Sequence, residues 1–337
     1  MKAKYLYIAA MASLAIAQTS CEKVSPQGVL MAGTGVEDRV EMSYLYYRLN
    51  NIEEKLDFDL KEVKDGYSFL VGADSHMTTD PGRTEEMFKI GLDKDDLFYC
   101  HLGDIADTKA EYYINLQNTI EGAKYDYVEK YYEYNVKDGF FYRKGAEDPI
   151  GRRYDGIKFP FFPVVGNHDL THNGWALWSN IFGSSFYEFD LLVGENENGE
   201  IYDHFIFLDT ASGTLGKKQV DLIEQGVLDG DNRYRYTFVF SHTNIFRPEA
   251  VQFSSTFARE ETYFLLDQFN KWNASIVFCG HVHAWDERLY NGVYYFSLDS
   301  MSERNSPNPG DYLLRIIINK DGEIEYERVR MNYVAKK

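Results

Sequence analysis

Five short motifs in this sequence combine carboxylate, imidazole and amide side chains that could hold metal ions. Oxygen and nitrogen donors without thiolates suit Mn, Fe or Zn, and they also suit an oxygen-rich ligand such as a phosphate group. A single motif of this kind carries little information, but together the motifs contain five of the eight histidines of the chain. In chain order they are Asp74-Ser75-His76, Gly103-Asp104-Ile105-Ala106-Asp107, Gly166-Asn167-His168-Asp169, Ser241-His242 and Gly280-His281-Val282-His283.

Each motif follows a short apolar or aromatic run that predicts a β-strand, because the runs are rich in Val, Phe, Tyr and Ile and end at turn residues. The runs cover residues 67–71, 97–100, 161–165, 236–240 and 275–279, and a sixth at 205–208 is followed by Asp209. Stretches with helical periodicity at 84–92, 217–228 and 259–272 alternate with these strands, and 38–54 predicts an accessory helix. Alternating strands and helices indicate an α/β fold.

The motifs lie where an α/β fold binds its ligands, which is beyond the carboxyl ends of the strands. Alternate residues of an extended segment share a face, so we expect Asp74 and His76 to point to the same side. The same reasoning applies to His281 and His283, although each imidazole could serve a different ion. Glycines beside the ligands would let the backbone turn sharply toward the site.

The order and spacing of the five motifs resemble those of the calcineurin-like metallophosphoesterases over roughly residues 66–300. The resemblance implies a two-sheet α/β sandwich with outer helices. An Asp-Gly turn between the apolar stretches 312–318 and 324–329 predicts a C-terminal β-hairpin that completes one sheet. We therefore expect a tether and accessory helix over 21–65, the core over 66–300 and the hairpin within 301–337.

The resemblance also implies a centre of two divalent metal ions, Mn, Fe or Zn, and a hydroxide held between them that attacks phosphorus. His168 would face the leaving group of the substrate and would be oriented by Asp169, as carboxylates orient other imidazoles near metals. The implied ligands form three groups: Asp74, His76 and His283 for one ion, Asn167, His242 and His281 for the other, and Asp104 for both.

Two positions depart from the pattern of that family. Thr243-Asn244 follows His242 where relatives often have a proline, which affects the shape of the loop and not the ligand. Asp107 stands where the purple acid phosphatase branch has a tyrosine, so a tyrosinate–iron centre is not expected. Asp107 could be a partner of the metal ligands or the cap of a helix that begins at residue 108.

Residues beyond the motifs could contact the substrate. His172 and Trp175 follow the third motif closely and could line the pocket, and Arg247 could hold a phosphate oxygen through both guanidinium nitrogens. The Tyr-rich segment 108–160 is predicted to be an insertion at the sheet edge, largely helical over 109–135. Its aromatic residues either form a packing surface or wall one side of the pocket.

The charge of the chain restricts its partners. The formal net charge is −18, and no cluster of Lys or Arg offers a basic surface, so a nucleic-acid polymer is not expected. A compact phosphate ester of a small molecule fits better, because the metal ions would attract its phosphate.

The N-terminus predicts export. Lys2 and Lys4 precede an apolar stretch over 5–17, which is too short to span a membrane but typical of a signal peptide covering residues 1–20. Cleavage after Ala17 would release a soluble periplasmic or secreted protein, whereas lipidation of Cys21 would anchor the chain to the bacterial cell envelope. Cys100 and Cys279 lie in apolar runs and are predicted to be buried thiols.

These features together predict an exported phosphomonoesterase or phosphodiesterase. The alternative is a non-catalytic envelope lipoprotein that binds a glycan or a protein through its aromatic insertion.

Overall fold

The computed structural model describes residues 35–50, 63, 65–107, 109–230, 233–246, 257–302 and 312–332. The predicted signal peptide, Cys21 and Arg247 lie outside the described residues. Among the helices of the described chain, none has the length and apolar character needed to cross a membrane.

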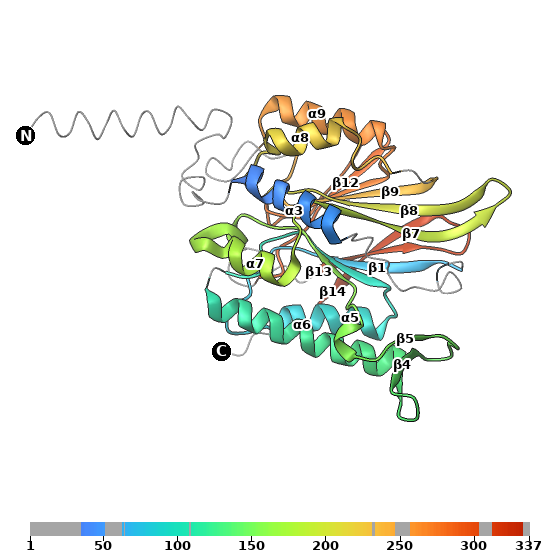
Figure 1. The fold of residues 1–337 in the computed structure, drawn as a ribbon. Coiled ribbons are helices and arrows are strands. Elements are labelled where there is room, and N and C mark those ends of the chain that lie inside the picture. The colour runs from blue at the N-terminus through green and yellow to red at the C-terminus, as the bar shows by residue number, and fades with distance from the viewer. Residues whose placement is uncertain are drawn as a thin grey trace, which may run out of the picture.

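Five strands form the first sheet (Figure 1). Its central strands run parallel, and the predicted C-terminal hairpin joins them antiparallel through β13. The order across the sheet is β14 (Ile324–Arg330), β13 (Tyr312–Ile318), β1 (Tyr67–Gly72), β2 (Phe98–His101) and β6 (Phe161–Pro163).

The second sheet contains six strands. Four neighbours run parallel, and an antiparallel strand covers each edge. The order is β11 (Asp286–Tyr290), β12 (Val293–Ser297), β10 (Ile276–Cys279), β9 (Tyr234–Ser241), β8 (Gly199–Phe207) and β7 (Tyr187–Asn196).

The two sheets pack face to face over a core dominated by phenylalanine. Along β1, Phe69 and Val71 point into this core while Leu70 points to the helices outside, as the period of two along a strand requires. Rings from both sheets meet edge to face, for example Phe69 and Phe238 with centroids 5.4 Å apart. Such pairs add about 0.5–1.5 kcal/mol beyond the area that they bury.

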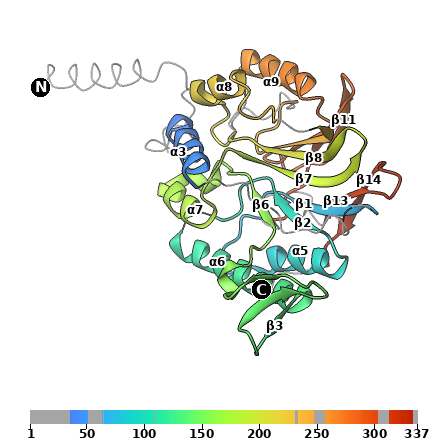
Figure 2. The ribbon, with the colours of Figure 1, turned by 45° about the vertical axis from the view of Figure 1, so that its right-hand side comes forward.

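Helices cover the outer face of each sheet (Figure 2). The first sheet carries α5 (Gly82–Asp93), α6 (Ala110–Tyr131) and α7 (Gly174–Phe182). The second sheet carries α3 (Val36–Asn50), α8 (Gly216–Glu224) and α9 (Arg259–Lys271). The predicted two-sheet α/β sandwich with outer helices and a C-terminal hairpin is confirmed.

The Tyr-rich segment is not an insertion at the sheet edge, which corrects the prediction. β2 and β6 are parallel neighbours, so the chain that leaves the end of β2 must return along the sheet to the start of β6. Helix α6 makes this crossover connection. α6 is about 33 Å long and leads away from the strand ends that carry the motifs. At its far end, Lys130 and Tyr131 bind Asp95 in the turn before β2.

A small separate sheet follows α6 at this far end, at the bottom of Figure 2. It consists of β3 (Tyr132–Asn135), β4 (Phe140–Arg143) and β5 (Pro149–Gly151). Several tyrosines pack into a cluster of their own around Tyr127, Val128, Tyr132 and Ile157. Most of the aromatic segment is therefore a packing unit, and the prediction that it walls the pocket is wrong for everything beyond the first turns of α6.

A buried histidine couples the stability of the second sheet to pH. His204 on β8 lies 2.5 Å from Asp190 through Nδ1 and 3.2 Å from Glu188 through Nε2. Burial alone would lower the pKa of His204, but these two carboxylates raise it to about 9.

We predict that His204 stabilises the fold fully below pH ~6.5 and that this contribution is lost as the pH rises through about 9. The difference in unfolding free energy between the wild type and His204→Gln should therefore shrink by up to about 3 kcal/mol across that window. Chemical denaturation at several pH values measures it. His172→Gln, a change at an exposed histidine, serves as the control, and an unchanged difference at His204 would contradict the prediction.

Candidate metal centre

The five motifs meet at one end of the sandwich because each follows a parallel strand at its carboxyl end. The loops after β1, β2 and β6 come from the first sheet, and those after β9 and β10 come from the second. The centre therefore lies at the end of the sandwich where the carboxyl ends of the parallel strands of both sheets meet.

The first group of candidate ligands consists of Asp74, His76, Asp104 and His283, whose ligand atoms all lie within 4.8 Å of one another. Nε2 of His76 and Nε2 of His283 are 3.3 Å apart, and Nε2 of His283 is 3.5 Å from Asp74 Oδ1. Two imidazoles that point the same nitrogen at one spot beside two carboxylates have the arrangement of a cation site.

The second group contains Asp104, His242 and His281. Nε2 of His242 lies 3.1 Å from Nδ1 of His281, 2.9 Å from Asn167 Oδ1 and 3.6 Å from Asp104 Oδ2. Nδ1 of His242 donates a hydrogen bond of 2.7 Å to the carbonyl oxygen of Leu102, which leaves the lone pair of Nε2 directed at the group. Asp104 belongs to both groups and joins them.

Buried charges set the electrostatics of this region. Burial alone would raise the pKa of Asp74, but the hydrogen bond and charge of His283 lower it below its usual value. Asp104 behaves in the same way, with His242 and His76 lowering its pKa against the effect of burial. The pKa of His76 is raised to about 9, because Asp107 and Asp104 outweigh the opposite effect of burial. The electrostatic field of these carboxylates therefore favours a positive charge among the ligand groups.

The backbone at the centre is left-handed, which corrects the prediction of extended segments. β1 ends at Gly72, and both Asp74 and His76 have positive φ, 51° and 43°. Asp104, His281 and His283 are also left-handed. This conformation costs non-glycine residues on the order of 1–3 kcal/mol each and is concentrated at functional sites. His281 and His283 accordingly point to different groups.

Two glycines allow these loops to touch. A Cβ on Gly166 would lie 2.1 Å from the backbone nitrogen of Asp104, and a Cβ on Gly103 would lie 2.7 Å from Nδ1 of His242. Gly103 also has a φ of +89°. A side chain at either position would push the two groups of ligands apart.

Asp169 does not orient His168, which differs from the expectation. The buried carboxylate of Asp169 accepts hydrogen bonds from the backbone N–H groups of Gly166, Ile105 and Ala106. Tyr113 on α6 adds its hydroxyl, and burial followed by the charge of Asp104 raises the pKa of Asp169 to about 7. Asp169 thus fastens two loops together.

Asp107 is the carboxylate that faces the imidazoles. Its Oδ1 lies 3.2 Å from Nδ1 of His76 and 3.7 Å from Nδ1 of His168. Helix α6 begins later, with Lys109 at its N-cap position, so Asp107 does not cap it. Of the two roles that the sequence left open for Asp107, the structure supports contact with the histidines and not the capping of a helix.

His168 lies at the rim of the centre. Its side chain is 44% exposed, and its backbone N–H donates to Asp104 Oδ1 at 2.7 Å. His172 is exposed nearby with a left-handed backbone. Trp175 is buried instead and stacks on Trp178 with centroids 5.5 Å apart, so it is a core residue and not the predicted wall of a pocket.

A buried ion pair that was not predicted from the sequence lies behind the loop of His242. Arg39 on α3 donates two hydrogen bonds of 2.8 Å to Asp209, and both side chains are fully buried. The next residue, Thr210, accepts hydrogen bonds through Oγ1 from the backbone N–H groups of His242 and Thr243. The pair therefore supports the loop that positions His242. The sequence feature that could have indicated this pair is the charged residue Arg39 between the apolar residues Val36 and Val40.

The sequence matches no protein-family model and no curated protein. Among solved structures, the chain is similar to the GAP50 anchor of the inner membrane complex of Plasmodium, with 12% identity over 80% of this chain and 90% of that one and a TM-score of 0.45. It is also similar to a putative 5′-nucleotidase from Staphylococcus aureus, with 12% identity over 81% and 55% of the two chains and a TM-score of 0.44. A dimetal phosphatase from Danio rerio shows 11% identity over 79% and 99% of the two chains, with a TM-score of 0.41.

We predict that Arg39→Met lowers the free energy of unfolding by about 3–5 kcal/mol, because it leaves the charge of Asp209 buried and unpaired. The double variant Arg39→Met/Asp209→Leu should recover much of that loss, since neither charge remains. Denaturant unfolding of the three proteins measures both effects. A single variant as stable as the wild type would contradict the supporting role of the pair.

Proposed function

We propose that this protein is a hydrolase that uses two divalent metal ions to hydrolyse a phosphate ester of a small molecule. The observation that carries the proposal is the pair of ligand groups that share Asp104 at the junction of the two sheets. Two adjoining cation sites are the arrangement that holds both the attacking and the leaving oxygen of a phosphoryl group.

The residues present fit such ions. Their donors are carboxylate, imidazole and amide atoms, which suit Mn, Fe or Zn. Asp74, His76 and His283 would hold one ion, with Asn167, His242 and His281 for the other and Asp104 between them. When bound, the ions would neutralise phosphate charge and make a water molecule more acidic.

The chain would supply proton transfer and orientation. We assign His168 to the leaving-group oxygen, because its imidazole is the exposed one beside both ligand groups. Asp107, 3.7 Å from Nδ1 of His168, would hold that ring so that Nε2 faces the substrate. A donor placed this way assists a poor leaving group such as an alkoxide.

A small substrate fits the charge of the protein. The net charge of −18 repels extended polyanions, so the attraction for phosphate must come from the centre itself. The alternative of a non-catalytic glycan- or protein-binding lipoprotein is not favoured. Its predicted binding surface, the aromatic segment after residue 108, packs largely against itself, while the aspartates and histidines proposed as ligands lie together in groups that could hold metal ions.

The role of Asp104 can be tested by metal content. Because Asp104 belongs to both ligand groups, Asp104→Asn should reduce the occupancy of both ions and abolish turnover. Elemental analysis gives the metal content, and p-nitrophenyl phosphate and its bis ester, assayed with Mn²⁺ returned to stripped protein, give the activity. Asp267→Asn at an exposed position is the control. Two full metal equivalents in an active Asp104→Asn protein would refute the assignment.

The role of His168 can be tested by the leaving group. An alkoxide needs a proton as the bond to phosphorus breaks, whereas p-nitrophenolate leaves unaided. His168→Ala should slow hydrolysis of an alkyl phosphate by about 10²–10⁴ and that of p-nitrophenyl phosphate far less, with metal content unchanged. Equal losses on the two substrates would assign His168 to positioning instead.

A further inference from the structure

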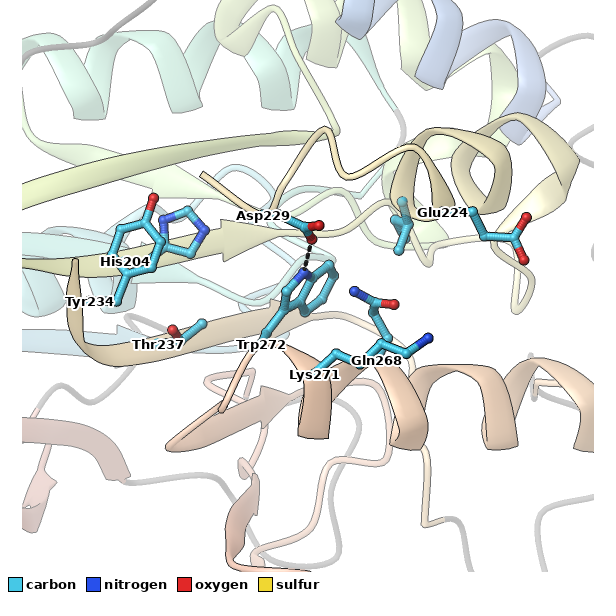
Figure 3. Close-up of a pocket in the computed structure, with 9 residues that line it drawn as sticks. His204, Glu224, Asp229, Tyr234, Thr237, Gln268, Lys271 and Trp272 are labelled. Carbon is cyan, nitrogen blue, oxygen red and sulfur yellow. Dashed lines mark hydrogen bonds between the residues drawn. The ribbon is translucent and has the colours of Figure 1, made fainter. Parts of the chain in front are cut away.

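A cavity of about 390 Å³ opens between α8, α9 and the outer face of the second sheet, away from the metal centre (Figure 3). Thr237 on β9 lies on its floor, five residues before His242, which corresponds to ~16 Å along the strand. The volume lies within the range of about 300–1,000 Å³ that small-molecule sites occupy. The cavity is lined by His204, Ile223, Glu224, Asp229, Tyr234, Thr237, Gln268, Lys271 and Trp272.

Two polar side chains that line this cavity have no hydrogen-bond partner among the described residues. The carboxamide of Gln268 is on a residue only 4% exposed and makes no hydrogen bond with any described residue. The hydroxyl of Thr237, also buried, makes none within the same part of the chain. The polar atoms of both side chains still reach the solvent of the cavity, so their donors and acceptors are open to water or to a polar ligand that replaces it.

A second buried glutamine shows that this fold can supply hydrogen-bond partners to a buried carboxamide. Gln219 on α8 accepts a hydrogen bond from the backbone N–H of Asp209 and donates to the carbonyl oxygens of Asp209 and Leu215. Gln219 is therefore structural, whereas the carboxamide of Gln268 on the neighbouring helix α9 makes no hydrogen bond with any described residue.

Aromatic rings and a carboxylate surround Gln268. Nε1 of Trp272 donates a hydrogen bond of 2.9 Å to Oδ1 of Asp229, which fixes the indole ring and leaves Oδ2 of Asp229 as an acceptor. Figure 3 shows the indole between this carboxylate and the carboxamide of Gln268. A flat ring beside amide and carboxylate groups matches a molecule with apolar C–H faces and several hydroxyl groups.

The charges of the cavity disfavour an anion. Glu224 and Asp229 are acidic, and Lys271 already pairs with Asp267 at 3.0 Å. His204 is basic, but Asp190 and Glu188 neutralise it from behind, and Tyr234 covers its ring. A phosphate ester would therefore find no unpaired positive charge among the lining residues.

We propose that this cavity binds a neutral sugar, separately from the metal centre. Gln268 and Thr237 would bond its hydroxyl groups, Asp229 would accept from another, and Trp272 would pack against its C–H face. This site is independent of the proposed hydrolase activity, and each can be present without the other.

The metal-loaded full chain should be titrated with glucose, galactose, mannose, N-acetylglucosamine and their common disaccharides, and with glucose 6-phosphate. Saturation-transfer NMR and tryptophan fluorescence report contact with the cavity. We expect at least one neutral sugar to bind and glucose 6-phosphate to bind more weakly than glucose. Gln268→Leu should weaken binding by about tenfold or more, while turnover of p-nitrophenyl phosphate stays unchanged.

The thermal midpoint separates loss of binding from loss of fold. Gln268→Leu should leave the Tm nearly unchanged, because the carboxamide faces the cavity and makes no hydrogen bond with any described residue. Gln219→Leu, the matched control, should lower the Tm, because it removes three hydrogen bonds. Thr237→Val provides a second variant that should weaken the same sugar. The proposal is overturned if no neutral sugar of the panel binds, or if binding survives in both Gln268→Leu and Thr237→Val.

Discussion

The carboxylates of Asp74 and Asp104 are buried where the two sheets meet, and their negative charge is the constraint on which the centre depends. In the part of the chain that the structure describes, their ion-pair partners are histidines alone, with no lysine or arginine. Buried charge without compensation costs several kcal/mol. The loops must therefore bring imidazoles to these carboxylates, and the left-handed turns and the glycines beside them allow this close approach.

The strands and the centre could be predicted from the sequence because their signals are local. Runs such as 97–100 and 275–279 are short, apolar and rich in residues that favour strands, and each became a buried strand beside its expected turn. Parallel strands then bring their carboxyl ends together without further information. For the same reason, side chains as distant in sequence as Asp74 and His283 were expected at one end of the fold, whereas their assignment to one group came from the resemblance to the calcineurin-like metallophosphoesterases.

The remaining features depend on contacts that no local pattern encodes. Whether Asp107 or Asp169 faces His168 follows from which loop turns inward, and that turn is made by left-handed residues of ordinary type. The crossover role of α6 depends on β6 pairing with β2, which composition does not reveal. Trp175 resembled a pocket residue because it follows a motif closely, yet the start of α7 turns it into the core.

Helix α3 has a consequence for the order in which the chain folds. Its Ser43 binds the backbone of Ser185, its Arg39 binds Asp209, and its Glu37 binds the backbone of Lys218, partners that lie 142, 170 and 181 residues further along the chain. Contacts this distant in sequence form only after the intervening chain has closed its loops. The earliest described element should therefore dock among the last, so the loop that holds His242 becomes rigid late. Hydrogen exchange of the α3 amides during refolding would measure when this helix docks.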